Sequence, residues 1–276
     1  MKASEIIAII EKHAAPDLAA PWDASGIQVA GLRPDVRRLA VMLDPTLENL
    51  TCAAEDGADF ILAHHPLSMK PRFPNRVDCY LSILSLLLSR GIWLYSAHTS
   101  LDAAPEGPAR WLADALNLAC VSTLDVTSGN DNLGSVPGFG FVGSLPEPLP
   151  YADFCRQLAG ALGCRAWQAC GPCPDTVSTV ACCPGSGSSL IETALAKRAD
   201  IFITGDVKYH AALDASVLGL RVLDVGHFIL EEEMMRRFSE SLAHALSIPL
   251  QFYPSCDPLV SERFDPSTTA PEEDAP

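Results

Sequence analysis

The chain is poor in basic residues. Of its 276 residues, 19 are Lys or Arg and 34 are Asp or Glu, which gives a formal net charge of -15. Nucleic acids and anionic membranes are bound through clustered Lys and Arg side chains, so we expect neither as a partner. An acidic surface favours solubility and is compatible with the capture of cations.

The sequence also lacks long apolar runs. Residues 6–10 are apolar but are flanked by Glu5 and Glu11, and residues 81–88 contain serines. A membrane-spanning helix needs about 20 apolar residues, and neither segment has the pattern of a secretory signal. Hydrophobic residues still make up 48% of the chain, enough for a sizeable core. We therefore expect a soluble, cytoplasmic protein.

The ten cysteines lack the even spacing of a disulfide-rich secreted domain. Residues 170–173 (Cys-Gly-Pro-Cys) have the letters of a thioredoxin-type redox motif. That motif should open a helix after a strand, whereas here a predicted strand follows it. We interpret the cysteines as reduced thiols in turns and strands, with a redox or structural zinc role as the alternative.

Strand-like apolar runs alternate with helical patterns along the chain, which is typical of an α/β fold. The pattern also repeats. Residues 37–65 predict strand, helix, Asp59 and strand, and residues 178–206 predict strand, helix, Asp200 and strand. Each unit continues with a helix, a strand, a histidine and a carboxylate four residues later. A duplicated α/β unit is the simplest account, and chance similarity between two generic units is the alternative.

We therefore predict two α/β units, residues 1–125 and 126–255. The segment from 257 to 276 is rich in Pro, Ser, Thr, Asp and Glu, and we expect it to be an acidic disordered tail. Short apolar runs separated by Gly, Asn and Ser predict hairpins between residues 121 and 145.

Histidines and carboxylates follow three of the predicted strands. They are His64 and His65 after residues 60–63, His98 and Asp102 after residues 92–96, and His227 and Glu231 after residues 222–225. The carboxyl ends of adjacent strands in an open α/β sheet converge on one crevice. Imidazoles combined with carboxylates suit Zn, Fe, Mn, Ni or Co better than Ca or Mg. We therefore predict a metal site whose ligands are His64, His65, Asp102, His227 and Glu231.

The adjacent pair His64 and His65 constrains this site. Neighbouring residues of an extended strand face opposite sides, so both can ligate only if the chain bends or if each binds its own ion. Pro66 gives a reason for a bend. If there are two ions, a carboxylate must bridge them, and Glu231 has the longer reach.

Four other residues are candidates for supporting roles. His98 lies one helical turn from Asp102 and is a predicted ligand partner or proton shuttle. Asp206 and His210 form another pair four residues apart after a strand. Asp44 ends a predicted strand, and we interpret it as a helix N-cap rather than as a catalytic group.

These stretches resemble the GTP cyclohydrolase 1 type 2 homologues, a family also described as dinuclear-metal-centre hexameric proteins. The matching segments, in the family's order, are residues 22–29, 43–46, 57–66, 96–104, 204–210 and 226–231. The resemblance implies intertwined duplicated units with mixed sheets flanked by helices, assembled as a homohexamer. It also implies two divalent ions per subunit, held by the five predicted ligands with Glu231 bridging. Ala24, Ser100 and Leu230 depart from the residues usual in the family, but no predicted ligand is replaced.

The family name implies cyclohydrolase chemistry on a guanine nucleotide. Our hypothesis is a metal-dependent hydrolase of a nucleotide or related phosphorylated metabolite, in which a hydroxide bridging the two ions attacks the substrate and His98 moves the proton. The alternative is a non-enzymatic metal-binding or metal-delivery protein, or an oligomeric scaffold, because the sequence contains no recognisable phosphate loop or specificity pocket.

Overall fold

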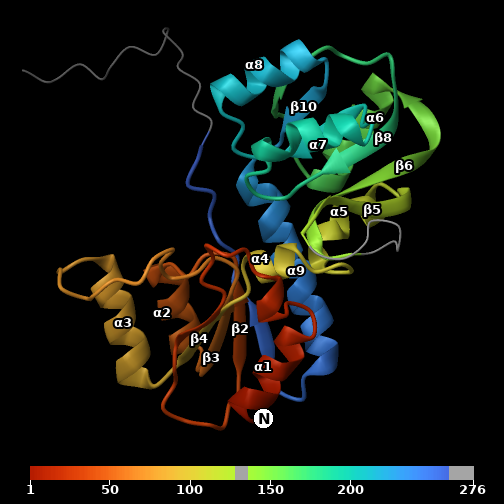
Figure 1. Ribbon diagram of the computed structural model, residues 1–276. Helices are drawn as coiled ribbons and strands as arrows, with labels where there is room; N and C mark the ends of the chain where they lie inside the picture. Colours follow the sequence, from red (N-terminus) through yellow and green to blue (C-terminus); the bar gives the residue numbers. More distant parts are fainter. Residues whose placement is uncertain (128–135, 261–276) are drawn as a thin grey trace, which may run out of the picture.

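The protein folds into two mixed sheets flanked by helices, which confirms the predicted α/β class (Figure 1). The computed structural model describes residues 1–127 and 136–260. Most of the predicted acidic tail therefore lies outside the described residues. No helix in the described part of the chain is both long enough and apolar enough to span a membrane.

The first sheet has the strand order β1-β4-β3-β2-β11. Its strands are β1 (Gly26–Val29), β2 (Leu39–Met42), β3 (Phe60–Ala63), β4 (Trp93–Ser96) and β11 (Leu250–Phe252). Strands β2, β3, β4 and β11 are parallel, and β1 pairs antiparallel with β4. Because β11 comes from the C-terminal part of the chain, the two halves of the sequence are intertwined.

The second sheet has the order β5-β6-β8-β9-β10-β7. Its strands are β5 (Ala119–Val126), β6 (Gly138–Pro150), β7 (Gln168–Cys170), β8 (Thr176–Cys182), β9 (Ile201–Thr204) and β10 (Arg221–Asp224). Strands β8, β9 and β10 are parallel, and the other pairs are antiparallel. The β5–β6 pairing agrees with the predicted hairpin. The division into residues 1–125 and 126–255 stays a prediction, and the chain crosses between the sheets before β5 and before β11.

Helices cover both faces of each sheet. They are α1 (Ala3–Glu11), α2 (Leu47–Glu55), α3 (Cys79–Arg90), α4 (Thr99–Asp102), α5 (Trp111–Ala115), α6 (Tyr151–Leu162), α7 (Ile191–Ala196), α8 (Tyr209–Leu218) and α9 (His227–Ala245), with 3₁₀ turns η1 (Pro16–Leu18), η2 (Pro108–Arg110) and η4 (Ser188–Leu190). The outer cores lie under α2 and α3 on the first sheet and under α7 and α8 on the second.

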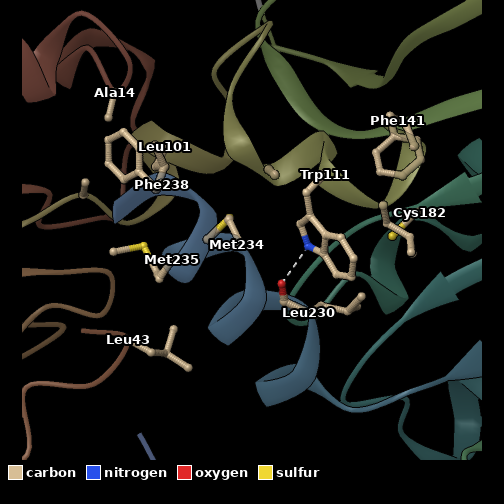
Figure 2. Packing of buried hydrophobic residues seen from close by; sticks show 14 of the residues in the cluster. Ala14, Leu43, Leu101, Trp111, Phe141, Cys182, Leu230, Met234, Met235 and Phe238 are labelled. Atoms are coloured by element: carbon tan, nitrogen blue, oxygen red, sulfur yellow. Dashed lines mark hydrogen bonds between the residues drawn. The ribbon is translucent and has the colours of Figure 1, made fainter. Parts of the chain in front are cut away.

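The central core belongs to both sheets at once, because α9 runs between them (Figures 1 and 2). Met234, Met235 and Phe238 of α9 are buried in this core. The indole Nε1 of Trp111 donates to the carbonyl oxygen of Leu230 at 3.0 Å, which fixes the first turns of α9 against α5. The side chains at the start of α9 are therefore held in place from both halves of the molecule.

The internal repeat has a matching physical contact in each half. Asp59 accepts hydrogen bonds from the backbone N–H groups of Arg37 and Arg38, at 2.9 and 3.1 Å. Asp200, 141 positions further on, accepts from the backbone N–H groups of Ser178 and Thr179, both at 2.8 Å. In each half, the carboxylate before the middle parallel strand binds the two backbone N–H groups that lie just before the preceding strand begins to pair with it.

We expect Asp200→Ala to lower the free energy of unfolding by about 1–3 kcal/mol, because two backbone donors lose their acceptor. Asp59→Ala should cost a similar amount. The exposed Asp214→Ala in α8 is the matched control and should change stability by less than about 0.5 kcal/mol. Urea unfolding monitored by circular dichroism measures all three. Equal stabilities for Asp200→Ala and Asp214→Ala would contradict this account.

Candidate metal centre

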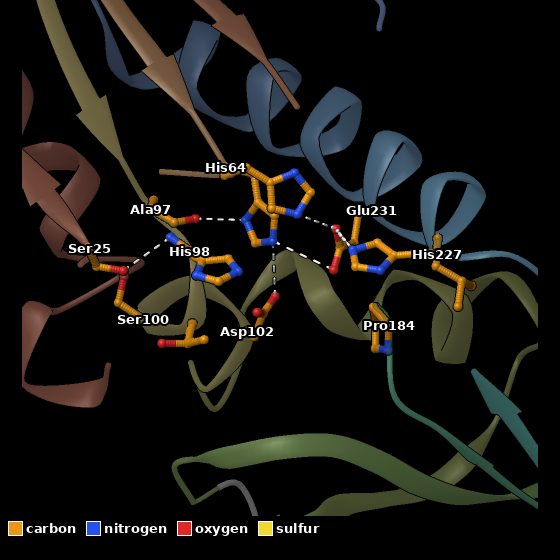
Figure 3. Close-up of polar contacts among 12 residues, drawn as sticks. Ser25, His64, Ala97, His98, Ser100, Asp102, Pro184, His227 and Glu231 are labelled. Carbon is orange, nitrogen blue, oxygen red and sulfur yellow. Dashed lines mark hydrogen bonds and ion pairs between the residues drawn. The ribbon is translucent and has the colours of Figure 1, made fainter. Parts of the chain in front are cut away.

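The predicted ligands lie at the carboxyl ends of strands from both sheets. His64 and His65 directly follow β3, and Asp102 is in α4, just after β4. His227 begins α9 after β10, and Glu231 lies one turn further along the same helix. Figure 3 shows the side chains of His64, Asp102, His227 and Glu231 pointing toward one another. The side chains that follow these strands do come together, but the expectation that the strands are neighbours in one sheet was wrong, because β3 and β4 belong to the first sheet and β10 to the second.

Three overlapping groups of side chains are close enough to hold an ion. They are His64, His65 and His98; His65, His227 and Glu231; and His64, Asp102 and Glu231. Oε1 of Glu231 lies 3.7 Å from Nε2 of His64, and Oε2 lies 3.1 Å from Nε2 of His65. Each oxygen of Glu231 thus faces a different group, as a bridging carboxylate does. None of these groups, drawn from the described residues, contains a cysteine.

The three histidines among the predicted ligands are each oriented through Nδ1. The Nδ1 of His64 lies 2.8 Å from the carbonyl oxygen of Ala97, and that of His65 lies 2.7 Å from Oδ1 of Asp44. The corresponding partner of His227 is Asp206, at 2.8 Å. Because these oxygens carry no hydrogen, each Nδ1 must donate, and in the neutral form of each ring the lone pair of Nε2 can bind an ion.

Two buried polar atoms in the centre make no hydrogen bond. They are Nε2 of His64 and Oδ1 of Asp102. Oε2 of Glu231, by contrast, lies 2.8 Å from Nε2 of His227 and 3.1 Å from Nε2 of His65. Unpaired buried polar atoms are costly and need a partner. Nε2 of His64 lies 3.7 Å from both Oδ1 of Asp102 and Oε1 of Glu231, close to the roughly 3.4 Å expected between ligands of a tetrahedral ion with 2.1 Å bonds. This donor set therefore fits a divalent cation.

A glycine makes room for the central carboxylate. Gly185 adopts a φ of +69°, in the left-handed region, and a β-carbon there would lie 2.3 Å from Oε1 of Glu231. The loop after β8 can approach Glu231 this closely only because residue 185 has no side chain.

Without an ion, protonated histidines balance the negative charge of the buried carboxylates. Burial lowers the pKa of His65, but the hydrogen bonds to Asp44 and Glu231 outweigh it and raise this pKa to about 10. The pKa of His227 rises to about 9, because Glu231 and Asp206 outweigh its burial. Burial also raises the pKa of Asp102 to about 6, with His64 opposing the shift. The carboxyl of Glu231 is buried too, but His64 and its other imidazole neighbours hold its pKa well below the usual range.

Sequence patterns did not reveal the partner of His98. Nδ1 of His98 lies 2.8 Å from Oδ1 of Asp23, whose carboxylate side chain is fully buried. Oδ2 of Asp23 also accepts from the backbone N–H and the hydroxyl of Thr99 and from the hydroxyl of Ser25. Burial alone would raise the pKa of Asp23, but these hydrogen bonds lower it well below its usual range. The only sequence signal was the Trp22-Asp23 pair in a loop.

The supporting candidates divide into two groups. Asp44 and Asp206 hold His65 and His227, as described. The interpretation of Asp44 as an N-cap was wrong, because Thr46 caps α2 by accepting from the backbone N–H of Asn49. His210 is exposed on α8 against Tyr209, and the described structure gives it no contact with the centre.

The fold and the site define an α/β protein with a candidate metal centre built between two related sheets. The chain belongs to the Duf34/NIF3 (NGG1p interacting factor 3) family, whose model matches residues 1–257. The GTP cyclohydrolase 1 type 2 homolog of Clostridium perfringens is 30% identical over 254 residues, which cover 91% of this chain and 95% of that protein. The resemblance inferred from the motifs is confirmed.

Solved structures show the same fold. Reduced HcgD from Methanocaldococcus jannaschii is 31% identical, with a TM-score of 0.79 over 91% of this chain and 97% of its own. A Bacillus cereus protein related to NIF3 has a TM-score of 0.83 over 95% of this chain and 99% of its own. At 24% identity, that second likeness concerns the fold alone.

We expect Glu231→Gln to lose bound metal from both groups, because the neutral amide removes the charge that faces each of them. Glu240→Gln, an exposed change on the same helix, is the control and should retain full metal content. Elemental analysis of both purified variants measures the difference. Two ions per chain retained in Glu231→Gln would reject the proposed ligand set.

Metal binding should release protons at neutral pH. His65 and His227 carry an extra proton below pH about 10 and about 9 in the metal-free protein, and a cation must displace it. Metal affinity should therefore fall as the pH falls below these values. Titration of the metal-free protein with Zn²⁺ in weakly buffered solution containing a pH indicator measures the release. Binding at pH 7 without acidification would contradict this charge assignment.

Proposed function

We propose that the protein is a metal-dependent hydrolase with a dinuclear centre. The observation that carries this proposal is the position of Glu231, whose two carboxylate oxygens face separate groups of buried donors. The residues that would hold the ions are His64, Asp102 and Glu231 in one group, and His65, His227 and Glu231 in the other. Two divalent ions, when bound, act as Lewis acids and lower the pKa of a water that they share.

His98 is positioned to move a proton beside these groups. Its ring centroid lies 5.1 Å from that of His64 and 5.5 Å from that of His65. Asp23 accepts from Nδ1, so Nε2 of the neutral ring carries a lone pair that can take a proton. The buried, strongly hydrogen-bonded Asp23 would then stabilise the imidazolium that forms. His98 also belongs to one of the three potential ligand groups, which makes metal content an essential control.

The names given to relatives of this chain are consistent with a hydrolytic reaction. Several are called GTP cyclohydrolase 1 type 2 homologs, including those of Clostridium perfringens and Methanocaldococcus jannaschii. Opening a purine ring by water requires an activated water beside the base, which a dinuclear centre can supply. A nucleotide or a related phosphorylated metabolite as substrate stays a prediction from the sequence.

One observation favours the non-enzymatic alternative. The side chains of His65 and His227 are 25% and 31% exposed, so ions on that side can exchange with solvent. Metal delivery would use this exposure without any chemistry. Rapid reversible metal exchange with no turnover would favour delivery, whereas turnover that depends on the metal would favour the hydrolase.

We also propose a cytoplasmic homo-oligomer, with a hexamer as the expected form. The support is the family resemblance. Sedimentation velocity of the purified chain would test the hexamer.

The direct test is a hydrolysis screen of the metal-replete protein against nucleotides, nucleosides, phosphoesters and amides. We expect at least one metal-dependent activity that is lost on chelation and restored by the ion found in the purified protein. A fully loaded protein that hydrolyses nothing in the panel would count heavily against the proposal.

For the substrate found, we expect Asp23→Asn to lower kcat by about 10²–10⁴-fold while KM and metal content stay close to normal, because His98 loses the group that orients it. Asp17→Asn, an exposed change nearby in the sequence, should retain full activity. Steady-state kinetics combined with elemental analysis separates a proton-transfer role from a metal-binding one. Loss of metal in Asp23→Asn would show that His98 is held as a ligand instead.

A further inference from the structure

A cavity of about 610 Å³ opens beside the candidate metal centre. His65 and His227 form part of its wall, and Nε2 of His227 lies 2.8 Å from Oε2 of Glu231 in the centre. The cavity therefore reaches the centre from its more exposed side. Its volume lies within the range of about 300–1,000 Å³ that is usual for small-molecule sites.

The wall of this cavity is acidic. Four aspartates line it: Asp44, Asp206, Asp224 and Asp257. No Lys or Arg is among the described residues that line it. Sites that bind phosphate groups normally present Arg, Lys or several free backbone N–H groups. A polyphosphate chain in this cavity would face four carboxylates, and the groups that attract it would be the ions of the centre and the uncapped N-terminus of α9 after Gly226.

The carboxylates are positioned to accept hydrogen bonds. Asp44 and Asp206 each use one oxygen to hold a histidine, and within the described chain the other oxygen makes no hydrogen bond to protein. Asp224 is held by the backbone N–H groups of Val207 and Gly226. These carboxylates suit a ligand whose N–H groups donate hydrogen bonds.

Aromatic and apolar surface completes the cavity. Trp167 and Phe228 line it, and both are partly buried against the central core, which restricts their movement. The C-terminal segment contributes Asp257 and Leu259. Ser255 attaches this segment to the first sheet, because its hydroxyl accepts a hydrogen bond from the backbone N–H of Asp44 at 3.2 Å. Planar rings bind well against aromatic side chains of this kind.

We propose that this cavity binds a planar nitrogen heterocycle that carries N–H donors and no phosphate, that is, a free base or nucleoside rather than a nucleotide. The inference rests on the proposed function, because it assigns the cavity to the substrate of the same centre. It narrows the substrate class predicted from the sequence. The acidic wall accepts the N–H donors, the aromatic side chains contact the ring, and the ions lie at one end of the bound molecule.

The test is calorimetric titration of the metal-replete protein with matched pairs: guanosine against GTP, and adenosine against ATP. We expect at least one nucleoside to bind ten or more times tighter than its own triphosphate. The ratio of the triphosphate dissociation constant to the nucleoside dissociation constant should shrink at high salt, because salt screens the repulsion between the phosphates and the aspartates. Equal or tighter binding of both triphosphates, a ratio below ten in both pairs, or no nucleoside binding at all would overturn the proposal.

Charge reversal tests the acidic wall. Asp257→Lys should lower the ratio of triphosphate to nucleoside dissociation constants at least threefold. Asp214→Lys makes the same change in net charge on α8, away from the cavity, and should leave the ratio unchanged. The same shift in both variants would show that overall charge, rather than the cavity, sets the preference.

Trp167 tests the aromatic wall. We expect Trp167→Ala to weaken nucleoside binding about tenfold, and Trp167→Phe to restore most of it. Tyr209→Ala, which removes an exposed aromatic ring from α8, should have no effect. Thermal unfolding checks that each variant is folded, and unchanged affinity in a folded Trp167→Ala would reject the role of this ring.

Measuring both binding and turnover distinguishes a failure of this inference from a failure of the proposed function. A nucleoside that binds tightly but is never hydrolysed would contradict the hydrolase and leave the cavity assignment intact. Hydrolysis of a triphosphate that also binds tighter than its nucleoside would support the hydrolase and reject the assignment of the cavity.

Discussion

A single buried carboxylate organises the centre of this protein. Glu231 is only 3% exposed and lies among the imidazoles of His64, His65 and His227. A buried charge is stable only when it is paired, so these side chains need compensating protons or cations. The position of Glu231 depends in turn on α9, whose first turns are fixed by Trp111 and whose later turns are buried in the core shared by both sheets. Metal binding and the packing of the two halves are thus parts of one arrangement.

The two halves of the internal repeat supply different residues to the candidate centre. The loop after the middle parallel strand carries His64 and His65 in the first half, and Gly205 and Asp206 at the corresponding positions in the second. Asp206 holds His227 instead of taking a place among the potential ligands. Each half supplies a histidine and a carboxylate four residues apart, but only the first supplies the His-His pair. Among the described residues, the two halves therefore contribute unequally to one candidate centre.

The sequence could not show that the ends of β3 and β4 meet the end of β10 from a second sheet. Much of the site could still be predicted, because residues that follow parallel strands lie at one edge of a sheet regardless of loop detail. The ligand candidates, the repeat and the family followed from that rule and from motif order. The role of Asp23 could not, because its contact with His98 spans 75 residues and depends on how one loop folds over another. Asp44 was misinterpreted for a related reason: a carboxylate before a helix is usually a cap, and only the packing shows that Thr46 takes that place.

The centre has a closed side and an open side, and this asymmetry bears on its chemistry. His64 is fully buried, and its partners Asp102 and Glu231 are mostly covered. His65 and His227 line the cavity. An ion held by the open group can meet a ligand that enters through the cavity. A reacting atom would therefore approach from the side of His65 and His227, where His98 lies within reach because its ring is close to those of both His64 and His65.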